Sequence, residues 1–426
     1  MPSHVTPPRG MRDFLPAEKR RRERVLSTVR DVYRSRGFDE IETPVVEGAE
    51  YLWSGLGGDN EKQVFAVLRR GLDLDAVRAV ASPLELADLG LRFDLTVPLA
   101  RFYASHRAEL PTVFRSVQIA PVWRAERPQK GRYRQFVQCD IDVLGEAGQQ
   151  AEVELISATT DVLDALGLTG TSIRVNDRRV LTGVLAHWGV PAELTDRALI
   201  EIDKLDKIGV DGVATQLREI GVEGVASQLA SIGVEAPGIA DQLRQLGEAT
   251  WDSATASPPP AWLDPAAFDD LLALRAALPG VGLVFDPTLV RGMGYYTGTI
   301  FEVAHPDFSY SLGGGGRYDG MIGRFLGTDV PAAGFSLGFE RIVDLVELDD
   351  ADDDGLVVLY DKAVAPVELL ALQRALVSRG EARVRLQKRA KNVGGQLDAL
   401  AAAGFRRFVA VRGGEALDDL EVRPLG

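Results

Sequence analysis

The stretch that decides the fold runs from Phe114 to Asp142 and has the sequence FRSVQIAPVWRAERPQKGRYRQFVQCDID. Two apolar segments, 113–124 and 136–144, flank the polar loop 126–134, which predicts two strands joined as a hairpin with a basic tip. Six cationic side chains lie in it: Arg115, Arg124, Arg127, Lys130, Arg132 and Arg134. Because a guanidinium group pairs bidentately with phosphate oxygens, an arginine at a strand end before a basic loop suits a phosphate ligand.

The second predicted strand carries Phe136, Gln138 and Asp142 at alternate positions, which share one face of a strand. An aromatic ring, an amide and a carboxylate on the same face as an arginine indicate a binding site. The alternative for such a charge run is a solvated hairpin tip.

Two glycine-rich stretches follow, RGMGYYTG at 291–298 and GGGGRYDG at 313–320. Glycine permits close approach of backbone to a ligand or to a crossing strand. Neither stretch has the GxxxxGK[ST] spacing of a P-loop. By itself, the first is also compatible with a turn that carries a surface arginine.

Working outward, helical spacing of apolar residues predicts an amphipathic helix over 17–36. We expect a strand from Ile41 to Val46 that carries Pro44, a strand pair at 296–303 and 308–313, and a strand that runs into a helix near Gly338. Residues 208–243 contain three similar segments, IGVDGVATQL, IGVEGVASQL and IGVEAPGIADQL, which indicate short helices and turns in an inserted region. Local duplication in a tolerant insert is the simpler explanation, and direct RNA contact is the alternative.

The C-terminal part begins after the acidic run 349–354 and alternates strands and helices. We expect strands at 357–360, 384–386 and 408–411, and helices at 365–378 and 394–403. This order predicts a small α/β domain with parallel pairing. Cationic side chains supply a basic face there: Arg383, Arg385, Lys388, Arg389, Lys391, Arg406 and Arg407.

Composition limits the class of protein. A chain of 426 residues is expected to form two or three domains. Its single cysteine, Cys139, and its four histidines argue against a disulfide framework and a zinc site. No apolar run is long enough for a membrane span, and no leader peptide is evident, so we expect a cytoplasmic protein without a membrane partner. The net charge of −14 argues against non-specific polyanion binding but leaves room for a local basic groove.

Taken together, the stretches resemble the signature motifs of class II aminoacyl-tRNA synthetases, and specifically the histidyl-tRNA synthetase family. Residues 37–44, GFDEIETP, are similar to motif 1, residues 114–142 to motif 2, and residues 334–341, GFSLGFER, to motif 3. The two glycine-rich stretches resemble the family's histidine-specific signatures. The likeness covers nearly the whole chain in the family's order.

The resemblance implies an α+β fold: an antiparallel sheet with helices, an inserted helical domain, and a C-terminal α/β domain of the anticodon-binding type. The expected domains are a catalytic core in two parts, 1–170 and 281–348, a helical insertion at 171–280, an acidic linker at 349–354, and a shortened C-terminal domain at 355–426. The family's last strand and terminal helix look trimmed here.

The implied activity is ATP-dependent formation of histidyl-adenylate from L-histidine, then transfer of the acyl group to tRNA(His). ATP, with the Mg²⁺ that accompanies it, is the implied cofactor. A homodimer is implied as well, with Pro44 of motif 1 at its interface.

The resemblance also implies roles for individual residues. Arg124 and Arg291 would stabilise charge at the α-phosphate and at the histidine carboxylate. The implied ATP-binding residues are Arg124, Glu126, Arg132, Phe136 and Arg341. The implied histidine-binding residues are Asp94, Thr96, Arg124, Gln138, Asp142, Arg291, Tyr295 and Tyr296.

Within that set, Asp142 and Tyr296 are expected to hold the two imidazole nitrogens. A neutral imidazole has one donor and one acceptor, which a carboxylate and a hydroxyl can satisfy together. Another amino acid would leave these groups unpaired, so such a pocket rejects analogues strongly.

One departure concerns the stretch 291–298, because Gly294 stands where the family usually has aspartate, so a charge beside Arg291 is lost. Three alternatives follow from the sequence: a paralogue that activates histidine or a relative for a metabolic pathway, a histidine-sensing regulatory subunit, and a non-catalytic RNA-binding protein. The sensor predicts loss of the ATP-contacting arginines, yet Arg124, Arg132, Arg291 and Arg341 are all present. The polar pocket set counts against the RNA-binding protein.

Overall fold

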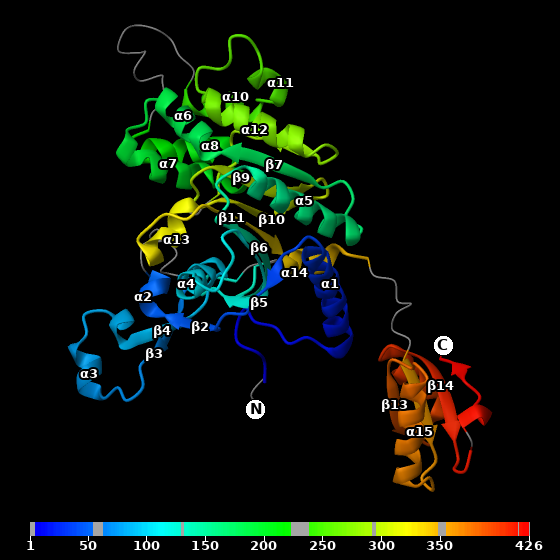
Figure 1. Ribbon diagram of the computed structural model, residues 1–426. Helices are drawn as coiled ribbons and strands as arrows, with labels where there is room; N and C mark the ends of the chain where they lie inside the picture. Colours follow the sequence, from blue (N-terminus) through cyan, green and yellow to red (C-terminus); the bar gives the residue numbers. More distant parts are fainter. Residues whose placement is uncertain are drawn as a thin grey trace. The chain divides into compact units, whose positions relative to one another are not determined.

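The computed structural model describes residues 5–53, 63–128, 132–222, 238–291, 295–347, 355–415 and 417–425 (Figure 1). Contacts group the chain into two units. The first comprises residues 1–13 and 25–346, and the second comprises residues 14–24 and 347–426.

An eight-stranded sheet forms the centre of the first unit. In spatial order its strands are β1 (Asp39–Glu40), β5 (Phe114–Trp123), β6 (Gln135–Leu144), β11 (Ala332–Gly338), β10 (Phe308–Arg317), β9 (Thr299–His305), β7 (Ser172–Asp177) and β8 (Leu283–Phe285). The pairs β1–β5 and β7–β8 are parallel, and the other pairs are antiparallel. The expected antiparallel sheet is therefore confirmed.

The hairpin of β5 and β6 follows the predicted alternation. Cys139, Ile141 and Val143 are buried on the face opposite Gln138 and Asp142. Helices α1 (Pro16–Ser35) and α5 (Gln150–Ala165) supply the apolar cover, because the buried Tyr33 of α1 lies near both Cys139 and Thr159 of α5. One face of the hairpin is therefore core, which leaves the other face for polar side chains.

The strand expected from Ile41 to Val46 is wrong. Residues 41–45 have no strand pairing and lie between β1 and β2 (Val46–Gly48). Pro44 has no N–H to donate to a ladder, and the buried Arg92 takes the carbonyls instead. Its Nη1 donates to the carbonyl oxygens of Thr43 at 2.8 Å and Pro44 at 3.3 Å, and its Nε donates to that of Pro121 at 3.0 Å.

A small second sheet follows this segment, with the order β2, β4 (Ala87–Leu91), β3 (Phe65–Leu68). Short helices accompany it: α2 (Ala49–Trp53), α3 (Leu74–Ala79), the 3₁₀ turn η2 (Pro83–Leu86) and α4 (Thr96–His106). A hydrogen bond joins the start of α4 to the large sheet, because the Gln118 side chain of β5 donates to the carbonyl oxygen of Leu95 at 3.1 Å.

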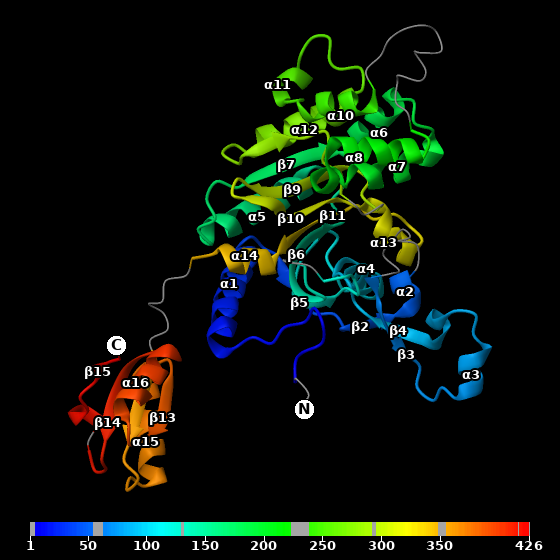
Figure 2. The same cartoon turned by 180° about the vertical axis from the view of Figure 1, so that it is seen from behind.

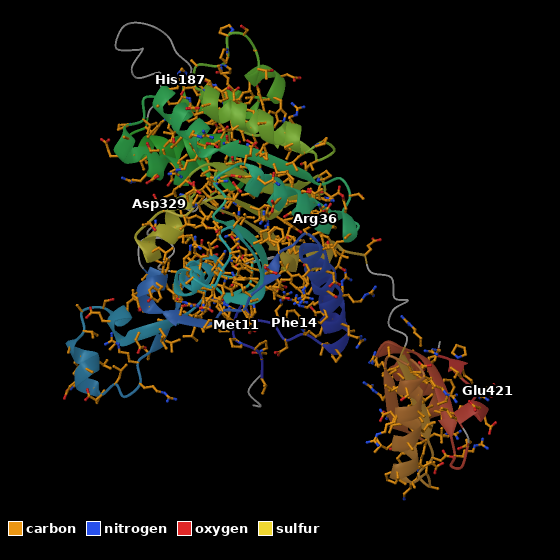
Figure 3. The ribbon with its side chains drawn as sticks, viewed as in Figure 1. Met11, Phe14, Arg36, His187, Asp329 and Glu421 are labelled. Atoms are coloured by element: carbon orange, nitrogen blue, oxygen red, sulfur yellow. The ribbon has the colours of Figure 1, made fainter. Side chains whose placement is uncertain are left out.

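The predicted insertion begins later than residue 171, because Ser172–Asp177 form β7 inside the central sheet. Its helices are α6 (Arg178–His187), the 3₁₀ turn η3 (Ala192–Leu194), α7 (Thr195–Ile202), α8 (Leu205–Glu219), α10 (Ile239–Gly247), α11 (Trp251–Ala254) and α12 (Pro265–Ala277). Helix α6 ends at His187, which Figure 3 labels. Helix α5 contacts β6 and β11, and α12 contacts β7 and α5 (Figures 1 and 2).

The near-repeat at 208–243 lies partly in these helices. Its first copy falls inside α8, which bends at Gly209, where φ is 68°. Gly221, at the same place in the second copy, also has positive φ, 89°. Such left-handed backbone favours glycine, so the glycine after isoleucine bends α8 in the first copy and follows the end of α8 in the second. Residues 223–237 lie outside the described residues.

The second half of the core is as expected. β9 and β10 form the predicted strand pair, and β11 runs into α14 (Phe339–Leu345) directly after Gly338. The four-glycine run belongs to β10 itself, which then leads to α13 (Asp319–Leu326).

The second unit contains a four-stranded sheet with the order β13 (Val384–Lys388), β12 (Gly355–Tyr360), β14 (Phe405–Val411), β15 (Arg423–Pro424). β12 pairs in parallel with β13 and β14, and the two-residue β15 is antiparallel to β14. Helices α15 (Pro366–Ser378) and α16 (Val393–Ala402) connect the parallel strands, and the 3₁₀ turn η5 (Leu417–Asp419) precedes β15. The predicted βαβαβ order is confirmed, whereas the acidic run 349–354 lies outside the described residues.

Among the described residues, no helix is long and apolar enough to cross a membrane.

Candidate active site

A row of polar side chains crosses the central sheet on the face opposite Cys139. Each member is the direct cross-strand neighbour of the next, and we call this set the polar row: Gln118, Asp140, Ser336, Gly314, Glu302 and Arg174. Cross-strand neighbours share a face, so five polar groups from five strands line up with one gap, at Gly314.

A second row holds Asp142, whose neighbour on β11 is Gly334. A Cβ atom at Gly334 would lie 2.0 Å from Asp142 Oδ1, so only glycine leaves space for this carboxylate. Tyr318, which follows β10, donates its hydroxyl proton to Asp142 Oδ1 at 2.5 Å. The rings of Tyr295 and Tyr318 meet edge to face with their centroids 6.0 Å apart. The ring centroids of Tyr295 and Tyr296 are 4.7 Å apart.

Asp94 and Gln138 supply buried acceptor atoms. Asp94 caps the start of α4, since its Oδ1 accepts from the Val97 amide at 3.2 Å. Gln138 Nε2 donates to Ser336 Oγ at 3.1 Å and to Asp140 Oδ2 at 3.2 Å. Within the described part of the chain, Asp94 Oδ2 and Gln138 Oε1 are buried without a hydrogen-bond donor. A buried polar atom without a partner is costly, so both atoms suit a ligand that donates hydrogen bonds.

The buried carboxyl groups in this region resist ionisation. Burial raises the pKa of Asp94 to about 6, against the opposing effects of the Val97 amide and the Arg124 charge. Burial raises the pKa of Asp142 to about 7, although the Tyr318 hydroxyl opposes this shift. Burial and the charge of Asp142 raise the pKa of Asp140 well above its usual value. A bound cation would favour the ionised carboxylates and so lower their pKa values.

Arg124, Arg132 and Arg341 also belong to this region. Arg124, just after β5, donates from Nε to the Phe93 carbonyl oxygen at 3.0 Å and lies over the Phe136 ring at 5.0 Å. Arg132 is exposed and lies 3.8 Å from Glu126 Oε2. Burial and the charge of Arg132 lower the pKa of Arg341, which lies over the Tyr310 ring at 4.9 Å.

Arg291 lies near Tyr295, Tyr296 and Arg341. Its Nη1 donates to Glu302 Oε2 at 3.0 Å. A Cβ atom at Gly314 would lie 2.1 Å from the same nitrogen, so this guanidinium group occupies the gap in the polar row.

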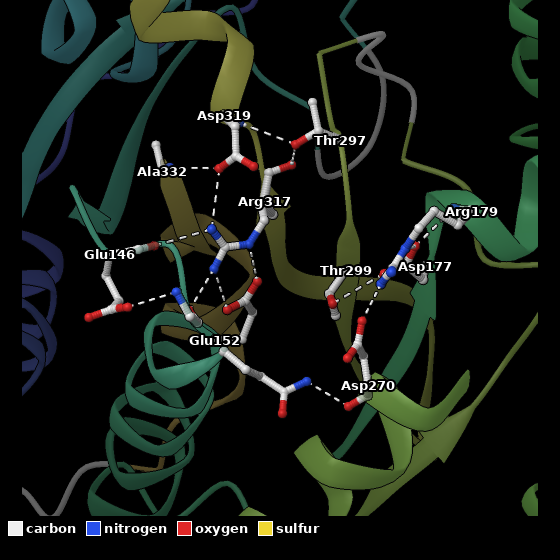
Figure 4. Close-up of polar contacts among 12 residues, drawn as sticks. Glu146, Glu152, Asp177, Arg179, Asp270, Thr297, Thr299, Arg317, Asp319 and Ala332 are labelled. Carbon is white, nitrogen blue, oxygen red and sulfur yellow. Dashed lines mark hydrogen bonds and ion pairs between the residues drawn. The ribbon is translucent and has the colours of Figure 1, made fainter. Parts of the chain in front are cut away.

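Arg317 and Asp319 of the same glycine-rich stretch have a structural role. Arg317 joins β10 to α5, because its Nε and Nη2 donate to the two carboxylate oxygens of the buried Glu152 at 2.6 and 2.7 Å (Figure 4). Arg317 Nη1 also donates to Asp319 Oδ1 at 3.2 Å, and Asp319 accepts from the Ala332 amide at 2.9 Å. A parallel cluster joins β7 to α12 through Arg179, which pairs with Asp177 and Asp270.

Of the predicted site residues, Phe136, Gln138 and Asp142 share one face of β6, and Asp94 lies close to Asp142 just before α4. Thr96 begins α4 directly after the Asp94 loop. The hydroxyl that bonds to Asp142 comes from Tyr318, whereas Tyr296 packs in the core against the backbone near Gly316. Lys130 and Gly294 lie outside the described residues.

Sequence reasoning missed several members of the site: Gln118, Asp140, Arg174, Glu302, Tyr318 and Ser336. Asp140 had a signal, since it shares the alternate spacing of Gln138 and Asp142. Tyr318 lay within a quoted stretch but received no role. Glu302 and Arg174 had no local signal.

Comparisons with known proteins agree on one family. The family model described as histidyl-tRNA synthetase matches residues 10–342. The histidine–tRNA ligase of Leifsonia xyli subsp. xyli is 58% identical, and the match covers all of this chain and 99% of that protein.

Two solved structures are also similar. The crystal structure of histidyl-tRNA synthetase from Nostoc sp. PCC 7120 has a TM-score of 0.72 at 27% identity and covers 99% of this chain and 97% of its own. An ATP phosphoribosyltransferase regulatory subunit/histidyl-tRNA synthetase from Bacillus halodurans has a TM-score of 0.73 at 21% identity and covers 98% of this chain and 100% of its own. At that identity the second likeness concerns the fold alone.

Proposed function

This chain belongs to the histidyl-tRNA synthetase family, and we propose from that premise that it activates L-histidine with ATP and charges tRNA(His) with it. The observation that carries the proposal is the pair of buried, donor-free acceptors, Asp94 Oδ2 and Gln138 Oε1, in the same pocket as Asp142. An amino acid's ammonium group brings three donors and a positive charge, so it matches both atoms and the surrounding carboxyl groups.

The imidazole ring would lie at Asp142. Tyr318 holds one carboxylate oxygen of Asp142, which leaves the other oxygen for an imidazole N–H. Tyr295 and Tyr296, whose rings are in contact, offer hydroxyl groups for the second ring nitrogen. A pocket built to bond both ring nitrogens discriminates against side chains that lack them.

Adenylate formation would use the arginines. A histidine carboxylate oxygen attacks the α-phosphorus of ATP, a new P–O bond forms, and pyrophosphate leaves with the electrons of the broken bond. Arg124 and Arg291 would stabilise the charge on the α-phosphate oxygens during this step. Phe136 would stack on adenine beside Glu126, and Arg132 and Arg341 would hold the outer phosphates.

Mg²⁺ would arrive bound to ATP. Among the described residues there is no group of three or more His, Cys, Asp or Glu side chains placed to hold a metal ion. The ion would therefore take most of its oxygen ligands from phosphates and water, where it screens their charge.

A hollow in the second unit supports the transfer half of the proposal. Tyr360, Lys362, Leu386 and Lys388 line it at the carboxyl ends of β12 and β13. Ligands of open α/β sheets bind at this edge, and the two ammonium groups suit an RNA backbone.

We also propose a homodimer in the cytoplasm. Pro44 and Val45 are exposed although they adjoin the buried Thr43, and the bonds from Arg92 hold their backbone in place. Sedimentation of the purified protein at micromolar concentration measures this directly; a monomer would contradict it.

The decisive assay uses purified protein, labelled histidine, ATP and Mg²⁺, with and without tRNA(His). We expect histidine-dependent ATP–pyrophosphate exchange, and transfer of label to tRNA only when tRNA is added. Exchange without transfer would favour the metabolic paralogue, and binding of histidine without exchange would favour the sensor.

A further inference from the structure

We infer that Glu302 and Arg174, two members of the polar row, are positioning residues that orient Arg291 for the activation step. The inference rests on the proposed function, since Arg291 is the group proposed to meet the substrate carboxylate and the α-phosphate. Neither Glu302 nor Arg174 belongs to the proposed substrate contacts.

The contacts form a chain. Glu302 divides its carboxylate between two guanidinium groups: Oε2 accepts from Arg291 Nη1 at 3.0 Å, and Oε1 accepts from Arg174 Nη1 at 3.1 Å. Arg174 is itself held by Asp286, which accepts from its Nε at 2.6 Å. Because β7 and β9 pair Arg174 directly with Glu302, the sheet's own hydrogen bonds set this spacing.

The gap at Gly314 explains why Arg291 can enter the row. Gly314 lies between Ser336 and Glu302 in the sheet, and any side chain there would overlap the Arg291 guanidinium group. The Arg291 guanidinium group thus occupies the space that a side chain at position 314 would take, although Arg291 itself is not in a strand. Its only described side-chain hydrogen bond is the one to Glu302, so that bond determines which of its nitrogens remain for substrate.

Charge balance favours a shared carboxylate over a simple ion pair. A carboxylate that served Arg291 alone would neutralise it and compete with an anionic substrate. Arg174 also binds the Glu302 carboxylate, so Glu302 offsets less of the Arg291 charge while it still orients that guanidinium group. Asp206 of α8, 3.5 Å from Arg174 Nη1, extends the chain to the helical insertion.

The test begins with Glu302→Gln, which keeps the size of the side chain but removes its charge. A misplaced catalytic group can lower a rate about a hundredfold, so we expect kcat of ATP–pyrophosphate exchange to fall roughly 10- to 100-fold. The KM for histidine should change by about threefold at most. Arg174→Met should behave similarly, and Arg174→Lys, which keeps the charge, should restore most of the activity.

The matched control is Glu154→Gln. Glu154 forms a comparable half-buried pair between a helix and a strand, since it accepts from Arg115 at 2.5 and 2.9 Å. It lies outside the site, so its loss should leave kcat unchanged. Thermal unfolding of all variants separates a fall in kcat from a loss of folded protein.

A double-mutant cycle with Arg291→Ala decides the matter. If Glu302 acts through Arg291, adding Glu302→Gln to Arg291→Ala should cause no further loss. If the two losses multiply, Glu302 has another role and the inference is overturned.

Calorimetry also gives the dissociation constant of ATP for the wild type, the two single variants and the double variant, and this measurement requires no turnover. A wild-type protein without exchange would contradict the proposed function, whereas the calorimetric cycle would still decide whether Glu302 acts through Arg291.

Discussion

Asp94, Asp140 and Asp142 bring three carboxyl groups into one buried pocket. Like charges in a low-dielectric site oppose one another's ionisation, so such a pocket favours either protons or a cation. The ammonium group of an amino acid is such a cation. At the scale of single residues, the pocket therefore couples substrate binding to the release of protons.

This coupling predicts a pH dependence. The pKa is raised to about 6 at Asp94 and to about 7 at Asp142, so both groups are protonated in acid and ionise as pH rises through this range. We expect kcat/KM for histidine to increase between about pH 5.5 and 7.5 and then level off, because kcat/KM reports the free enzyme. Exchange kinetics at saturating ATP, corrected for titration of free histidine, measure it.

Asp142→Asn supplies the control for that profile. The variant should be weakly active and should lose the inflection near pH 7 while it keeps the one near pH 6. An unchanged profile would exclude Asp142 as its source. The effect on stability has the opposite direction. In this pH range the folded state binds protons that the unfolded chain has released, so these groups lower the free energy of unfolding of the ligand-free protein as pH rises from about 4 to 7.

At the scale of elements, an ion pair between Arg317 and Glu152 fixes the C-terminal end of the glycine-rich strand β10. Arg317 ends β10 and donates to the buried Glu152 of α5, and it also donates to the carbonyl oxygens of Glu146 and Gly148. A strand of four consecutive glycines has little side-chain packing of its own. The ion pair therefore holds β10 where Gly314 and Gly316 shape the site.

Breaking this pair should destabilise the first unit. Arg317→Met leaves Glu152 buried without its cation, which typically costs about 3 kcal/mol or more. We expect the denaturant-induced unfolding transition to move down accordingly. The double variant Arg317→Met/Glu152→Met should be more stable than the single one, because it leaves no unpaired charge.

The exposed pair of Arg423 and Glu421 serves as the comparison for that prediction. Surface ion pairs contribute little, so Arg423→Met should leave unfolding nearly unchanged. Equal effects of Arg317→Met and Arg423→Met would refute the anchoring role of Arg317.

At the scale of the whole molecule, the activation site and the hollow with Lys362 and Lys388 belong to different units. The chain carries a net charge of −14, so polyanion binding depends on local clusters of cations. The division predicts that the two half-reactions can be separated by mutation.

Reversing charge in the hollow tests this separation. Lys362→Glu/Lys388→Glu should lower kcat/KM for tRNA roughly tenfold or more and reduce its salt dependence, since fewer phosphate contacts form. Histidine-dependent exchange without tRNA should stay at the wild-type level. Arg374→Glu, an exposed reversal on α15 outside the hollow's lining, is the matched control. Loss of exchange in the double variant would argue against separate sites.

Local periodicity was enough to predict much of this molecule. Alternation along residues 135–144 placed Phe136, Gln138 and Asp142 on one face, and helical spacing predicted α1 within a residue at each end. The resemblance of the motifs added the family and the chemistry of its substrates, and the comparisons agree on the family. Such patterns are visible in sequence because strand and helix periods span only a few residues.

The tertiary structure alone decided the rest. The polar row depends on the register of strands that are far apart in sequence, and register follows from packing and turn geometry across the whole sheet. That register made Glu302 the partner of Arg291, left a gap at Gly314, and brought Tyr318 to Asp142. Likewise, the bonds from Arg92 to Thr43 and Pro44 replaced a strand that local propensity predicted. The sequence thus determined which faces and motifs exist, and long-range packing determined which side chains meet.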